Sequence, residues 1–162
     1  MSFYLKQIVS KLTPSAKKHL DMAINLAVSR RHYEVDIIHL IYVIISNDKN
    51  LIEQLAKETL LNPPSIINAI EKEFMELPQG DVNTPVFSEI LVSFIEKSWL
   101  HASTKWSCSS LDTPALFATV LYTARELLPE RVSYSLNCQK KVAENILRQS
   151  CEASICLLYT SD

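Results

Sequence analysis

The chain has 162 residues, which is the size of one domain or of two small halves that share a core. Its 48% hydrophobic and 21% charged residues are sufficient to bury that core without metals or disulfides. A net charge of -2 argues against a general affinity for nucleic acid. We therefore interpret the short basic clusters as solubility features; they are Lys17-Lys18, Arg30-Arg31 and Lys140-Lys141.

Glycine occurs once, at Gly80. Loops that cradle a phosphate need several glycines so that backbone amides can approach the anion, and neither common nucleotide-binding motif can be written in this chain. Glycine scarcity also disfavours a hairpin-rich β fold, which depends on positive φ angles in its turns. We expect no cofactor in this segment.

The N-terminus lacks the long apolar region of a secretory signal. The most apolar run, Ile37 to Ile45, is far below the ~20 residues that span a bilayer. We therefore expect a cytoplasmic chain with no membrane partner and with reduced thiols. The four cysteines show no CxxC pairing and the histidines are scattered, so no metal site is predicted; the cysteines are Cys108, Cys138, Cys151 and Cys156.

Helix signals in the first half begin with a short amphipathic helix over Ser2 to Leu12. Thr13-Pro14 is typical of an N-cap and first helical position, and predicts a helix to about Arg31. Three further helices are predicted: a buried one capped by Asp36 that contains residues 37–45, one over residues 51–60 and one over residues 62–76. The breaker-rich segment of residues 77–85 is the predicted connector between the halves.

The second half repeats this plan. Helices are predicted from Ser88 to about Thr104, over residues 113–124, over residues 131–136, and from the cap Asn137 to about Gln149. The polar segment of residues 105–111 is expected to be a mobile loop. We expect disorder after Ser150, where residues 151–162 form a tail, a linker or a foreign end.

A displacement of 75 positions aligns the two halves without a gap. Identity is low, but the apolar periodicity agrees. Such a repeat implies two similar helical units that bury their faces against each other. We predict an all-α, pseudo-twofold fold with a leading helix over residues 2–11, a first repeat over about 12–76 and a second over about 87–149.

Three segments resemble the N-terminal domain of Clp ATPases, and within that family the ClpV (TssH) branch of type VI secretion: Leu12 to Pro14, Ser29 to Val35 followed by His39-Leu40, and Asn83 to Ser88. The leading helix also fits that branch. Two positions depart from the family pattern: Ile38 stands where an acid is common, and Pro114-Ala115 replaces a His-Leu pair.

The resemblance implies a non-catalytic recognition domain. ClpV-like proteins bind a helical N-terminal segment of the large sheath subunit (TssC, also called VipB) in an apolar groove, and their AAA+ rings then disassemble the contracted sheath. By this resemblance, hexamer formation, ATP and Mg are expected only in AAA+ modules that this segment lacks.

We predict that the leading helix forms one wall of that groove. It is amphipathic, too short to be stable unless docked, and joined to the next helix by a tight turn. The competing interpretation is that these side chains pack into the core, which is the commoner position of apolar residues. The predicted contact residues are Leu5, Ile8, Val9, Leu12, Ala16, Thr84, Pro85 and Phe87.

Two alternatives remain open. The N-domain of a general Clp disaggregase or protease-partner ATPase would bind unfolded proteins or adaptors. A small hydrolase would use Cys108 or Ser109 as nucleophile and His101 as base, and would show turnover and a reactive thiol. His39, by contrast, is predicted to be a hydrogen-bonded core histidine.

Overall fold

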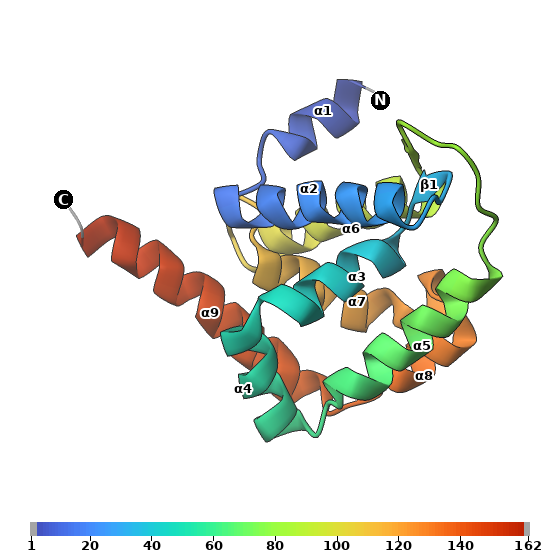
Figure 1. Cartoon of the computed structure of the whole chain (residues 1–162). Helices are drawn as coiled ribbons and strands as arrows, with labels where there is room; N and C mark the ends of the chain where they lie inside the picture. The colour runs from blue at the N-terminus through green and yellow to red at the C-terminus, as the bar shows by residue number, and fades with distance from the viewer. Residues whose placement is uncertain (1–2, 161–162) are drawn as a thin grey trace.

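The computed structural model describes the backbone of residues 3–160 and the side chains of residues 4–151 (Figure 1). Within this part, the chain forms nine α-helices, one π-helical turn and two short strands. The first half contains α1 (Phe3–Val9), α2 (Pro14–Ser29), β1 (Glu34–Val35), α3 (Ile37–Asn47), α4 (Lys49–Thr59) and α5 (Pro63–Glu76). The second half contains β2 (Val86–Phe87), α6 (Glu89–Leu100), the π-helical turn His101–Lys105, α7 (Thr113–Leu127), α8 (Glu130–Ser135) and α9 (Lys140–Thr160).

Three predicted helix starts are confirmed by their caps. Thr13 Oγ1 accepts a hydrogen bond from the Ala16 amide, and Ser88 Oγ accepts one from the Leu91 amide. Asn62 caps α5 through the Ser65 amide. These side chains satisfy backbone donors that the first turn of a helix leaves without a partner.

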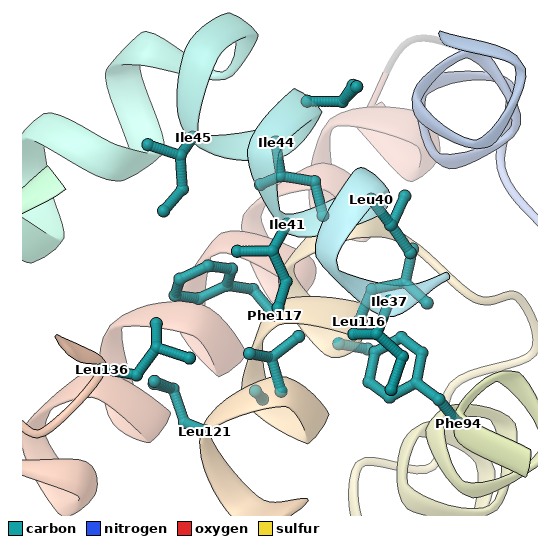
Figure 2. Close-up of a cluster of buried hydrophobic side chains, with 14 of the residues drawn as sticks. Ile37, Leu40, Ile41, Ile44, Ile45, Phe94, Leu116, Phe117, Leu121 and Leu136 are labelled. Carbon is teal, nitrogen blue, oxygen red and sulfur yellow. The ribbon is translucent and has the colours of Figure 1, made fainter. Parts of the chain in front are cut away.

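The centre of the core lies between α3 and α7, the helices with the most buried side chains among the described residues. Figure 2 shows side chains of α3, including Ile41 and Ile44, facing Phe117 and Leu116 of α7, with Phe94 of α6 beside them. Around this centre, α2 packs against α3, α6 against α7, and α7 against α9. The duplicated halves therefore share one core, as the repeat predicts.

Short parallel backbone pairings join the halves at two places. β1 pairs with β2, in the register Glu34 with Val86 and Val35 with Phe87. At the second place, the amide of Leu111 donates to the carbonyl of Lys11 (2.8 Å), and the amide of Thr13 donates to the carbonyl of Leu111 (3.0 Å). In each pairing, the segment before the first helix of one repeat (α6 or α2) lies beside the segment before the second helix of the other repeat (α3 or α7).

Helix α1 packs on α6 of the second repeat, although α2 of the first repeat follows it in the chain. Its inward stripe places Leu5 and Ile8 in the core. Because seven residues are too few to be helical alone, this contact stabilises α1.

The helical path of α6 continues through the π-helical turn to Lys105, close to the predicted end at Thr104. Three expectations need correction. The last helix begins at Lys140, so Asn137 is not its cap. The two strands were not predicted, because two-residue strands carry no periodic signal. The last helix does not end near Gln149 but extends to Thr160. Residues 151–160 contain no proline or glycine that would end it, and residues 161 and 162 lie outside the described part.

Candidate functional site

The predicted contact residues around α1 divide by burial. Leu5, Ile8, Ala16 and Pro85 are buried, so the protein's own side chains cover them. Val9, Leu12 and Phe87 are half-buried against the core, and Thr84 is exposed. A partner on this surface would therefore touch the half-buried residues and Thr84, whereas the buried ones support the surface from beneath.

Exposed apolar side chains near this surface were missing from the predicted set. Tyr4 is 54% exposed, Val86 63% and Ile90 42%. They belong to α1, β2 and the first turn of α6. The helical pattern contained a signal for Ile90, because it lies outside the buried stripe of Leu91, Phe94 and Ile95.

The direction of α1 determines where these residues lie along α6. The ammonium group of Lys11, just after α1, lies 5.9 Å from the centre of the Trp99 ring near the end of α6. Helix α1 therefore runs alongside α6, with its first residues toward the end of α6 that follows β2 (Figure 1). Tyr4, Val86, Phe87 and Ile90 therefore lie toward the start of α6, and Val9 and Leu12 lie toward its end. We call the strip that these six residues form along α1 and α6 the α1 surface.

A histidine pair flanks β1 in the chain: His32 precedes β1, and His39 lies in α3, which follows it. Nε2 of His39 lies 2.9 Å from Nδ1 of His32, and Nδ1 of His39 accepts a hydrogen bond from the Asp36 amide (2.9 Å). Because Nδ1 of neutral His39 accepts, its Nε2 carries the proton and donates to His32. Both rings pack on Phe74.

This arrangement confirms the prediction that His39 is a hydrogen-bonded core residue. Burial, and then the neighbouring His32, lower the pKa of His39 to about 4. Burial also lowers the pKa of His32. The pair is therefore neutral at pH 7 and holds β1 and the start of α3 in place.

Two residues of the hydrolase alternative, Cys108 and His101, contact other residues. The Cys108 thiol donates to the Trp106 carbonyl (3.7 Å), and Nε2 of His101 lies 3.4 Å from a Glu144 carboxylate oxygen. Burial lowers the pKa of His101. Within the described part of the chain, nothing in this geometry favours the hydrolase alternative.

The described cysteines and acids give no metal centre. Cys108 and Cys138 are half-buried, Cys151 is buried, and the side chain of Cys156 lies outside the described residues. Among the described side chains, no group of three or more His, Cys, Asp or Glu residues is arranged to hold a metal ion. None of the helices in residues 3–160 is both long and apolar enough to cross a bilayer.

A separate cavity of about 550 Å³ lies between α5 and α8. Most of the residues that line it are polar, and they include Asn68, Lys72, Arg131 and Tyr134. Arg131 is held there by Glu73 and Glu76. The cavity contains none of the predicted contact residues.

The family model of the Clp repeat (R) N-terminal domain matches residues 11–118. The chain belongs to this family. The match begins just after α1 and includes all of the first repeat and α6. No curated protein sequence matches the chain.

Solved Clp N-domains share the fold along nearly the whole length. The N-domain of ClpV from Vibrio cholerae is 24% identical, with a TM-score of 0.76 over 91% of both chains. A ClpV N-domain in complex with a VipB peptide is 23% identical, with a TM-score of 0.72 over 91% of this chain and 93% of that one. The Hsp104 N-terminal domain from Candida albicans is 12% identical, with a TM-score of 0.68 over 85% and 89%. Clp N-domains of more than one branch therefore have this architecture.

Proposed function

We propose that this Clp N-domain is the substrate-recognition domain of a ClpV-like unfoldase and binds a helical N-terminal segment of the type VI sheath subunit TssC/VipB. The observation that carries the proposal is the docked helix α1, which carries the exposed Tyr4 and packs on α6, near whose start Val86 and Ile90 are exposed. An amphipathic peptide helix can cover such a surface with one face. The fold of a ClpV N-domain that is known with a VipB peptide supports this choice.

The α1 surface supports a modest affinity. Ordering a flexible peptide offsets much of the energy of an apolar contact, so we expect a micromolar Kd. Several such domains linked in one hexamer would raise the effective concentration of binding sites. In this proposal, the hexamer, ATP and Mg belong to AAA+ modules, the recognition domain requires no cofactor, and the protein acts in the bacterial cytoplasm.

The second candidate is the N-domain of a general Clp disaggregase, which the Hsp104-like fold favours. It predicts binding to unfolded chains without preference for a helix. Fluorescence anisotropy separates the two candidates. A labelled sheath-subunit N-terminal peptide should bind with a micromolar Kd, and an unfolded polypeptide without that segment should not compete. Equal competition by the unfolded polypeptide would favour the second candidate, and failure of the sheath peptide to bind would contradict the proposal.

A further inference from the structure

The N-terminal segment has an unusual charge. The first 20 residues contain four lysines and no acidic residue, although the chain as a whole is net acidic. All four lysine side chains are exposed, and within the described part of the chain none of them forms an ion pair. We call these residues the basic rim: Lys6, Lys11, Lys17 and Lys18.

The lysines of the basic rim occupy positions that the fold does not favour for a positive charge. Neither α1 nor α2 has an acidic residue in its first turn, where a carboxylate would interact favourably with the helix dipole. Lys17 instead places a cation at the start of α2, where the helix dipole disfavours it. Asp112 lies near this end of α2, but its carboxylate accepts hydrogen bonds from the Thr13 hydroxyl and the Thr113 amide. Charges that violate a local rule without a structural gain are expected at functional surfaces.

The basic rim borders the α1 surface. Lys6 lies on the outer side of α1, between the exposed Tyr4 and the half-buried Val9. Lys11 follows α1, and its contact with Trp99 holds the ammonium group near α6. Lys17 and Lys18 continue the positive charge along α2. A peptide on the α1 surface would therefore have lysines beside its apolar contacts.

We propose that the basic rim selects a partner helix whose apolar face is flanked by Asp or Glu, and that it steers this helix onto the α1 surface. This inference rests on the proposed function. Complementary charges at the edge of an interface act mainly on partner choice and on the association rate. Each exposed pair contributes little alone, so the preference comes from several lysines acting together.

The test uses two amphipathic peptides with the same apolar positions, one with Glu and the other with Gln at the flanking positions. Anisotropy and stopped-flow association are measured with the whole chain at low and at physiological ionic strength. The Glu peptide should bind about fivefold more tightly at low salt, mostly through faster association, and the difference should shrink as salt screens the charges. The Lys6→Glu/Lys11→Glu variant should lose or reverse the preference.

Lys140→Glu/Lys141→Glu is the matched control, because it makes the same change in net charge on the exposed start of α9. It should retain the preference for the Glu peptide. Equal affinity for both peptides, or equal effects of the two double variants, would overturn the role proposed for the basic rim. The proposed function would not be affected. Failure of both peptides to bind would overturn both. A third outcome would be that the protein dimerises with increasing concentration, that Lys6→Glu/Lys11→Glu abolishes this dimerisation, and that the two peptides bind equally. That outcome would assign the basic rim to contact with a second copy of the chain and would also overturn the inference.

Discussion

The Thr13 hydroxyl donates a hydrogen bond to the Asp112 carboxylate across the two repeats, over 2.7 Å. Both residues are N-caps: Thr13 caps α2 and Asp112 caps α7. The equivalent contact joins the other two capped helices across the repeats: Ser88, the cap of α6, donates to Asp36, the cap of α3 (3.1 Å). The pseudo-twofold relationship therefore extends to two reciprocal hydrogen bonds between helix caps.

Replacement of Thr13 by Ala should destabilise the protein by about 1–2 kcal/mol, because it removes both a helix cap and a hydrogen bond to a charged group. Urea unfolding monitored by circular dichroism measures this change. Thr13→Ser retains the hydroxyl and should stay within about 0.5 kcal/mol of the original protein. Equal losses in both variants would assign the effect to the methyl group and contradict the role of the hydroxyl.

Acidification should destabilise the fold through its histidines. Burial lowers the pKa of His19, His32, His39 and His101, so the unfolded chain binds protons at a pH where the folded chain does not. The stability that neutral His39 contributes is complete above about pH 6.5 and is lost as the pH falls toward 4. Between pH 7 and 5 this residue alone should account for roughly 1–2 kcal/mol.

His39→Gln is the matched variant for that prediction. A glutamine at the third position of a helix can accept from the cap amide, as His39 does from Asp36, and it does not titrate. Its amide group can also donate to His32. The variant should show a shallower loss of stability between pH 7 and 5 in thermal melts. A pH dependence identical to that of the original protein would contradict the role of His39.

Two adjacent arginines should differ in their contribution to stability. Arg30 makes two hydrogen bonds to Glu71 and packs over the rings of Phe74 and Tyr42, whereas Arg31 pairs with Asp81 in an exposed position. Arg30→Ala should cost about 1 kcal/mol, after allowance for partial exposure of the ion pair, and Arg31→Ala close to zero. Chemical denaturation of both variants tests the difference, and equal effects would contradict it.

Substitutions in the α1 region should separate binding from folding. Ile90→Asp changes a partly exposed residue of the α1 surface and should weaken peptide binding at least about tenfold with little change in melting temperature. Leu5→Ala removes a buried side chain and should destabilise the docked helix by about 2 kcal/mol or more. Calorimetric titration and thermal melts measure the two effects. Unchanged peptide affinity in Ile90→Asp would place the contact elsewhere.

Most of the helical architecture could be predicted from the sequence, because each signal there is local and strong. Thr13-Pro14, Asn62-Pro63 and Ser88 start helices where their side chains cap the first turn. The apolar run from Ile37 to Ile45 is buried because it has almost no polar face. The β1–β2 pairing depends on tertiary position and has no such signal.

The candidate site could be predicted only in part. The apolar stripe of α1 was correctly placed on one face, but periodicity does not show whether that face meets a partner or the protein's own core. Leu5 and Ile8 pack inside the protein, and Val9 and Leu12 lie at the margin. Tyr4 and Val86 were missed because exposure depends on which neighbouring element covers a side chain, and a single helix or strand pattern does not specify that neighbour.

The two hydrogen bonds of Leu111, to Lys11 and Thr13, have a mechanical consequence. A force applied to α1 would first detach it from α6. It would then act on these two backbone hydrogen bonds, which join the repeats. Beyond these hydrogen bonds, the force would be divided between α2 in the first repeat and the segment before α7 in the second. Traction on a captured partner would therefore be carried by both halves of the domain rather than by its first helix alone.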